Sequence, residues 1–287
     1  MSQSKHSVGS SIQHTSQSAP HVFLSLGDFL QERLFFHPSL LDEREPLGEG
    51  DEMALNTILE GRSIDECYDA TLAVVIDALD IQPDQRVRFE LNSCDSKDLA
   101  SLIGGDIEAQ EQNPLVGLRG VARYTDSNCK KPFIRECEII KSLRAKGIAI
   151  EVVVPFVKSL SDAARVIDAL AEQGLPRGLN GLRVLFGADT PSAALLSERL
   201  LKYFDGVVVD LEVLAQLTLG VDMSNEHVSQ ALSLDNEPVL ELVSRAFGNA
   251  QAANKSHILL LPESAYQSDK IHDLLNDFLS TDVVLKG

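Results

Sequence analysis

Short runs of β-branched and aliphatic residues alternate along the chain with longer segments whose apolar residues recur at helical spacing. This alternation is typical of βα units that surround a parallel sheet. Eight runs fit strands, and they lie at His21–Ser25, Arg86–Leu91, Val116–Gly120, Ile150–Val154, Leu182–Gly187, Gly206–Asp210, His257–Leu261 and Asp282–Leu285. The pattern predicts a single α/β domain.

The segments between these runs carry helix-start signals. Ser161–Glu172 and Ser192–Tyr203 are amphipathic, and each opens with a residue able to cap the first helical turn. Ser63 and Glu66 form a capping-box pattern ahead of Cys67–Leu79, which indicates a helix before the second strand. Eight such units close most economically into a (β/α)8 barrel, the TIM barrel, although a doubly wound sheet shares the alternation and periodicity does not exclude it.

The two ends of the chain depart from this pattern. Residues 1–20 are rich in Ser and Gln and have no apolar run, so they are predicted to be a disordered tail, and residues 21–287 are predicted to form the barrel. The chain stops at Gly287, directly after the last predicted strand, which leaves no clear eighth helix. We expect that groove to be covered by the segment Phe29–Phe36, by a partner subunit, or by nothing.

Composition narrows the classes of function. The chain of 287 residues has 25 basic and 43 acidic side chains, a net charge of −18, so a nucleic acid is not expected as a partner. Its four cysteines lie far apart without the spacing of a zinc site or a disulfide framework, which favours reduced thiols in the cytoplasm. Its apolar runs are much shorter than the roughly 20 residues of a membrane span, so no membrane is expected either.

In a parallel barrel the chemistry is expected at the carboxyl ends of the strands. The candidate residues at those ends are Glu90, Arg119, Asp189, Asp210, Glu212 and Glu263. Asp189 and Glu212 are candidate ligands for a hard cation such as Mg²⁺, although a hydrated acidic rim explains them as well. Arg119 can grip an anion or pair with the acids beside it. Arg123 follows it in the next loop and either joins that site or is a surface or helix-start residue.

From Gly104 to Gly220 the sequence resembles the C-terminal barrel of phosphoenolpyruvate (PEP) synthases, relatives of pyruvate phosphate dikinase. NPLVGLRGVARY (Asn113–Tyr124) is similar to the family's segment containing NPMLGFRG, and FIRECEIIKSLR, GLPRGLNGLRV, TPSAALLSERLLKYFDG and QLTLGVD follow in the family's order. Weaker similarity extends from about Leu24 to Asp282. The resemblance implies a PEP-binding TIM barrel. It also implies phosphoryl transfer between a phosphohistidine and pyruvate, with Mg²⁺, phosphate-gripping arginines and a cysteine general acid.

Carried over residue by residue, the family's site is incomplete. Arg119 matches the arginine of the family's GLRG motif, and Asp189 is a shortened form of its metal-binding Glu. Glu90 stands where the family has a phosphate-binding arginine, Val213 where it has a metal-binding Asp, and Leu261 where it has the cysteine. The resemblance therefore implies that a metal ligand, a general acid and one arginine have been lost.

These departures predict a barrel mouth that repels PEP. Two like charges about 5 Å apart repel by roughly 3 kcal/mol even at an effective dielectric constant near 20. We therefore expect a catalytically degenerate barrel, a pseudoenzyme that acts by binding or regulation, as a homodimer, with a partner protein, or with a small anionic ligand. The alternative is a metal-dependent phosphotransferase or lyase that acts on PEP, pyruvate or another oxo-acid with Asp189, Arg119 and Mg²⁺.

Overall fold

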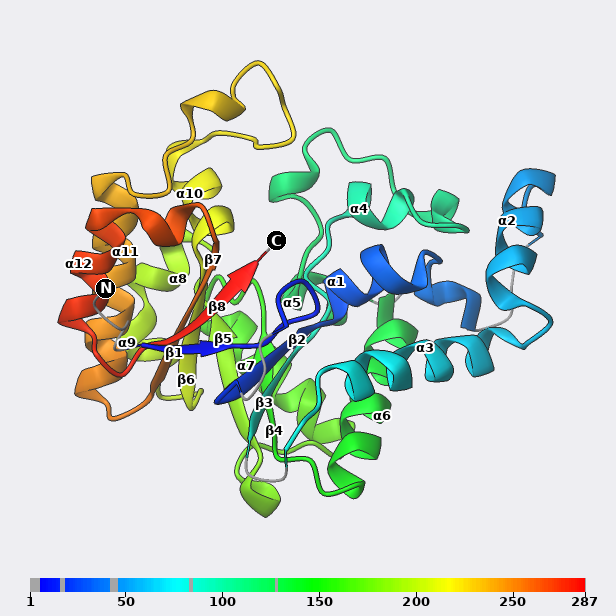
Figure 1. Cartoon of the computed structure of the whole chain (residues 1–287), viewed down its shortest axis with the longest axis horizontal. Helices are drawn as coiled ribbons and strands as arrows, with labels where there is room; N and C mark the ends of the chain where they lie inside the picture. Colours follow the sequence, from blue (N-terminus) through cyan, green and yellow to red (C-terminus); the bar gives the residue numbers. More distant parts are fainter. Residues whose placement is uncertain (1–5, 16–18, 42–45, 83–84, 127–128, 287) are drawn as a thin grey trace.

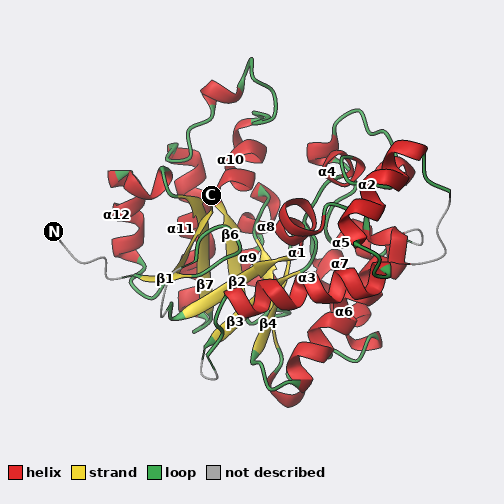
Figure 2. Cartoon of the chain, turned by 45° about the vertical axis from the view of Figure 1, so that its right-hand side comes forward, coloured by secondary structure: helices red, strands yellow, loops and turns green. Residues whose placement is uncertain are grey.

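The centre of the molecule is an eight-stranded parallel sheet rolled into a nearly closed barrel, with helices around its outside (Figures 1 and 2). The structure is a computed structural model that describes residues 6–15, 19–41, 46–82, 85–126 and 129–286. The strands are β1 (Ser7–Gly9), β2 (His21–Ser25), β3 (Arg86–Glu90), β4 (Ile150–Val154), β5 (Arg183–Gly187), β6 (Gly206–Asp210), β7 (Ser256–Pro262) and β8 (Asp282–Lys286). The predicted TIM-type barrel is confirmed.

The helices lie between the strands, with α11 and α12 at one side of the barrel in Figure 1 and α3 and α6 at the other. They are α1 (Leu26–Phe29), α2 (Glu49–Leu59), α3 (Ile64–Ala78), α4 (Ser96–Ala100), α5 (Val121–Tyr124), α6 (Lys130–Ala145), α7 (Leu160–Glu172), α8 (Pro191–Leu195), α9 (Ser197–Leu200), α10 (Leu211–Leu219), α11 (Glu237–Ala252) and α12 (Asp269–Asp277). The capping box predicted at Ser63 and Glu66 is present at the start of α3. No helix in the described part of the chain is long and apolar enough to cross a membrane.

The predicted strand at Val116–Gly120 is wrong. A 3₁₀ helix at Pro114–Val116 occupies this stretch, and the chain then turns into α5. Gly120 has a φ of 51°, and a side chain there would place a Cβ 2.6 Å from the Cβ of Phe156, two residues beyond the end of β4. The short apolar run resembles a strand, but the backbone needs glycine to make a tight turn against the neighbouring strand end.

The prediction that residues 1–20 are disordered is also wrong where the structure describes them as a strand. β1 pairs in parallel with β8, so that Ser7 lies opposite Asp282. Just beyond β1, the Ser10 N–H donates to the His21 carbonyl at 3.0 Å, and the Phe23 N–H donates to the Ser10 carbonyl at 2.8 Å. The segment therefore joins β8 to β2 and satisfies backbone groups that two free strand edges would leave unpaired. Residues 1–5 and 16–18 of the predicted tail lie outside the described residues.

Alanine at position 9 tests this closure of the barrel. A Cβ on Gly9 would collide with the imidazole ring of His21, so Gly9→Ala is expected to lower the free energy of unfolding by about 1–3 kcal/mol, as overpacking does. Urea denaturation measures the change. The matched control is Gly248→Ala in α11, where a Cβ meets nothing within 4 Å, so alanine should be neutral or slightly stabilising. Equal stability of Gly9→Ala and the wild type would contradict the placement of β1.

The interior of the barrel has three layers, because side chains along a strand alternate between its two faces. The middle layer is apolar and consists of Phe23, Val153, Leu185, Val208, Ile258, Leu260 and Val284. Below it, at the amino ends of the strands, Arg88 has no exposed surface and contacts Glu151 at 3.1 Å and Asp282. Above it, at the carboxyl ends, lies the barrel mouth. The outward-facing residues pack against the helices in a separate, larger core.

Candidate functional site at the barrel mouth

The barrel mouth gathers charged groups from strands that are far apart in sequence. Ser25, Glu90, Asp210 and Lys286 are the last residues of β2, β3, β6 and β8, and they line one small cavity with Asp28 from α1. Each of the four strand-end residues lies two positions after a residue that faces the barrel interior. Because side chains along a strand alternate between its two faces, the four side chains also point inward, into the mouth. Most of these groups are carboxyl groups, which makes the mouth acidic.

Lys286 is the cation of this cavity. Its ammonium group lies 2.7 Å from Asp210 Oδ2 and 3.9 Å from Glu212 Oε2. These carboxylates outweigh the effect of burial, and the pKa of Lys286 is raised as a result. Asp210 also caps α10, because its Oδ1 accepts hydrogen bonds from the backbone N–H groups of Glu212 and Val213. The Lys286–Asp210 pair therefore joins β8 to the start of α10 across the mouth.

Three more carboxyl groups lie near one another in the mouth: Glu90 and Asp189 are buried, and Asp28 is half-buried. Burial, and then the neighbouring Asp189 and Asp28, raise the pKa of Glu90 to about 8. Burial likewise raises the pKa of Asp189 to about 7, although its carboxylate accepts a 2.7 Å hydrogen bond from the Phe156 N–H. The pKa of Asp28 is raised to about 6, again chiefly by burial. At neutral pH the mouth thus holds Glu90 mainly in its protonated form.

Arg119 lies close to this group but makes no ion pair among the described residues. Its guanidinium donates to the Ser93 carbonyl from Nε at 3.2 Å and from Nη2 at 3.0 Å. The same group stacks over the ring of Phe156, with Cζ 4.2 Å from the ring centroid. Phe156 has a φ of 54°, which is uncommon for a residue with a side chain. Arg119 is thus held between a backbone carbonyl and an aromatic ring.

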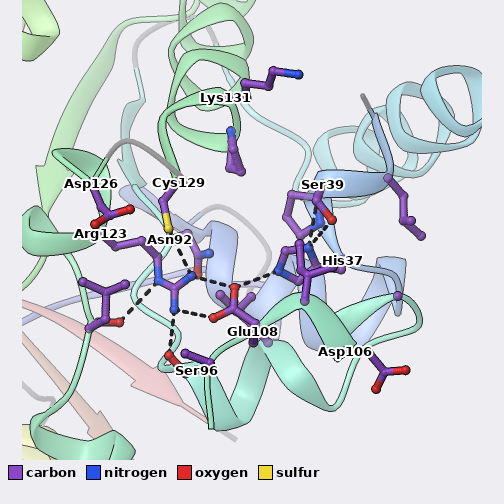
Figure 3. Close-up of a pocket in the computed structure, with 18 of the residues that line it drawn as sticks. His37, Ser39, Asn92, Ser96, Asp106, Glu108, Arg123, Asp126, Cys129 and Lys131 are labelled. Atoms are coloured by element: carbon purple, nitrogen blue, oxygen red, sulfur yellow. Dashed lines mark hydrogen bonds and ion pairs between the residues drawn. The ribbon is translucent and has the colours of Figure 1, made fainter. Parts of the chain in front are cut away.

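Arg123 lies outside the mouth, in the short helix α5, as the helix-start alternative predicted. It is buried, not on the surface, and donates two 2.8 Å hydrogen bonds to the carboxylate of Glu108 (Figure 3). His37 Nε2 lies 3.1 Å from the same carboxylate. These residues line a separate cavity of about 830 Å³ beside the barrel. The structure therefore does not bring Arg119 and Arg123 to one site.

Two of the positions compared with the family's motifs do not point into the mouth cavity. Leu261 faces outward into the core between sheet and helices, whereas Leu260 faces inward and lines the mouth cavity. Val213 lies in the first turn of α10, where its N–H is bonded to Asp210. Glu90 does line the cavity. A one-residue slip along a strand reverses the direction of the side chain, so Leu260 is the residue of β7 to consider at this site.

The residues of the mouth do not fit a Mg²⁺ ion. Among the described residues, no three His, Cys, Asp or Glu side chains are grouped as a metal site. Asp189 is bonded to the Phe156 N–H, whereas Glu212 lies near Lys286, so the two candidate ligands have different neighbours. The ammonium of Lys286 holds Asp210, the oxygen donor between them in sequence. A cation supplied by the chain itself thus lies among these acids.

Sequence reasoning missed Lys286, Asp28 and Glu108. Lys286 follows Val284 at inward-facing spacing, so the alternation in β8 was a signal that could have found it. Asp28 follows the end of β2 in a short helix that periodicity does not predict. The pairing of Glu108 with Arg123 joins positions 15 apart in sequence, through a loop with no repeating pattern.

Comparison with known proteins identifies a family to which the sequence of the chain is similar. The model of the PEP-utilising enzymes' PEP-binding domain matches residues 63–260. The phosphoenolpyruvate synthase of Neisseria meningitidis serogroup B is 39% identical over 163 residues, which cover 56% of this chain and 20% of that protein. The phosphoenolpyruvate synthase of Escherichia coli K12 is 37% identical over 174 residues, which cover 60% of this chain and 22% of that protein. A solved citrate synthase variant covers 98% of this chain and 87% of its own, with a TM-score of 0.47 and 13% identity, and this likeness is too low to carry an argument.

The fold and the place of the charged residues define a parallel α/β barrel with its candidate site at the carboxyl ends of the strands. Within that class, the chain belongs to the family of PEP-utilising enzymes and corresponds to their PEP-binding domain. The resemblance inferred from the segment Asn113–Tyr124 is confirmed. The matched region spans about a fifth of the length of the curated relatives.

Proposed function

We propose that this chain is a member of the family that has lost PEP chemistry and acts by binding, as a regulatory or partner-binding protein. One observation carries the proposal. The cavity in the barrel mouth has a volume of about 30 Å³, which is the space of a single water molecule. Sites for small molecules are typically about 300–1,000 Å³. The Lys286–Asp210 pair and the buried acids occupy the room that a substrate would need.

The charge of the mouth supports the same proposal. PEP carries a phosphate and a carboxylate, and a site for it needs concentrated positive charge. Here Glu90 lies at the end of β3, Arg119 is bonded to the Ser93 carbonyl, and Lys286 is paired with Asp210. The free thiols of all four cysteines agree with a cytoplasmic location, which is part of the proposal. The partner we propose is a second copy of the chain or another protein.

Calorimetric titration with PEP, and with oxalate as an enolate mimic, tests this function. Each ligand is titrated with and without Mg²⁺, and we expect no saturable binding with a Kd below about 1 mM. The N. meningitidis phosphoenolpyruvate synthase is the positive control. Lys286→Ala, which opens the mouth without removing its acids, should also fail to bind. Saturable binding of PEP by the wild type, or PEP turnover that Arg119→Ala abolishes, would overturn the proposal.

A further inference from the structure

A large cavity lies beside the barrel mouth and is separate from it. Its volume of about 830 Å³ is in the range of small-molecule sites. It is bounded by a 3₁₀ helix at Pro38–Leu41, by a second one at Gly105–Ile107, and by the amino-terminal turn of α6 (Figure 3). Its apolar wall includes Leu40, Leu99 and Phe133, so it offers a surface to an apolar body.

The arginine that lines this cavity is already neutralised. Arg123 forms a two-point ion pair with Glu108, and the carboxylate of Glu108 also contacts His37 (Figure 3). Although burial opposes ionisation, hydrogen bonds from His37 and Arg123 lower the pKa of Glu108 to about 2. Arg123 further donates to the hydroxyl of Ser96 at 3.0 Å. Its donors are therefore committed to the protein, and an anionic ligand would have to displace Glu108.

Glu136 is a buried carboxyl group of this cavity that has no ion pair among the described residues. It lies on the buried face of α6 with 7% of its surface exposed, and it lines the cavity. Its Oε2 accepts a 3.1 Å hydrogen bond from the Asn92 N–H, and among the described residues no Lys, Arg or His lies within ion-pair distance of it. Burial raises the pKa of Glu136 to about 8, although the hydrogen bond from the Asn92 N–H and the charge of Arg123 act in the opposite direction. A buried carboxylate is costly unless a positive partner compensates it.

We propose that this cavity is a binding site for a small amine, whose protonated amino group pairs with Glu136 while its apolar body packs against Leu40, Leu99 and Phe133. The ligand supplies the direct ion pair that Glu136 does not make with a described side chain. Asp106 also lines the cavity and adds negative charge to it. The amino terminus of α6 and Lys131 border the same space, and they would favour an anion instead. The proposal therefore predicts a specific order of affinity among matched ligands.

Benzylamine is the probe, and benzyl alcohol and benzoate are its neutral and anionic counterparts of similar shape. We expect benzylamine to bind at least tenfold more tightly than benzyl alcohol, and benzoate not to bind. Because ionised Glu136 is needed for the pair, binding at pH 7 should release about 0.9 proton per ligand from a group with a pKa near 8. Calorimetry in phosphate and in HEPES, which differ in ionisation enthalpy, measures that release.

Glu136→Gln is the variant that tests the proposed ion pair between the amino group of the ligand and Glu136. Glutamine keeps an oxygen for the Asn92 N–H but cannot ionise, so the fold should persist while benzylamine affinity falls at least tenfold and proton release disappears. Glu138→Gln is the matched control, because Glu138 lies on the same helix with its side chain 51% exposed, and it should bind as the wild type does. Failure of benzylamine to bind, unchanged binding by Glu136→Gln, or preferential binding of benzoate would each overturn the proposal. Since the cavity is separate from the mouth, these results are independent of the PEP titrations.

Discussion

Arg88→Ala should lower the free energy of unfolding by about 3–5 kcal/mol, the cost of removing one partner from a buried ion pair. Arg88 has no exposed surface and lies between Glu151 and Asp282 in the lowest layer of the barrel interior. Without its guanidinium, Asp282 loses its closest positive partner, Glu151 keeps only its contact with Arg183, and a cavity remains. Urea denaturation followed by circular dichroism at pH 7 measures the loss.

Arg86→Ala is the matched control for this prediction. Arg86 contacts the same carboxylate of Asp282 at 3.4 Å, but its side chain is 49% exposed. Water screens such a pair, so its removal should cost less than about 1 kcal/mol. If the two alanine variants lose the same stability, the contribution of Arg88 does not come from its buried position. Arg88 and its partners lie at the amino ends of the strands, where barrel residues mainly serve stability.

The strands of the barrel could be predicted where burial on both faces produces a continuous β-branched run. The bounds predicted for Ile150–Val154 and Gly206–Asp210 are those observed for β4 and β6. Such runs are typical of parallel strands covered by helices. β1 could not be found in this way, because its three residues are held by pairing with β8 at the other end of the chain. The false strand at Val116–Gly120 shows the opposite error, since a short apolar run carries no information about the turn at Gly120.

The candidate site could be predicted only in outline. Glu90 and Asp210 are the last residues of strands and Asp189 follows β5, so topology alone brings them to one rim. The sequence does not reveal that Lys286 reaches Asp210 or that Arg119 stacks on Phe156, because these contacts depend on rotamers and loop paths. The sequence comparison placed Leu261 at the site, but Leu260 is the residue that faces inward. An error of one position reverses the assignment, since neighbouring residues of a strand face opposite sides.

The folded protein should lose stability as the pH rises from 6.5 to 8.5. Burial raises the pKa of Glu90 and of Glu136 to about 8, and that of Asp189 to about 7. A carboxyl group whose pKa is higher in the folded state than in the unfolded state stabilises the fold fully below its unfolded pKa. That stability is lost as the pH rises through its folded pKa. Each group with a pKa near 8 should therefore cost about 2 kcal/mol over this interval.

Other shifted groups contribute little over this interval of pH. The pKa values of Glu108 and Asp282 are lowered, so their contributions change only in more acidic solution. His21 and His257 also have lowered pKa values, so the release of protons from their unfolded forms adds about 0.4 kcal/mol of stability each above pH 6.5 and slightly opposes the decline. The pKa of Lys286 is raised, so it stays charged throughout. The decline between pH 6.5 and 8.5 is therefore expected to come from the buried carboxyl groups.

Glu90→Gln isolates the part of this decline that arises in the barrel mouth. Glutamine cannot ionise, so the variant should lose about 2 kcal/mol less than the wild type between pH 6.5 and 8.5. Urea denaturation at closely spaced pH values gives both slopes. Glu263→Gln, at an exposed position beyond the end of β7, should keep the wild-type slope. Parallel curves for Glu90→Gln and the wild type would mean that Glu90 is already ionised at pH 6.5. Glu90 would then be ionised at neutral pH, and the mouth would carry one more negative charge and repel PEP more strongly.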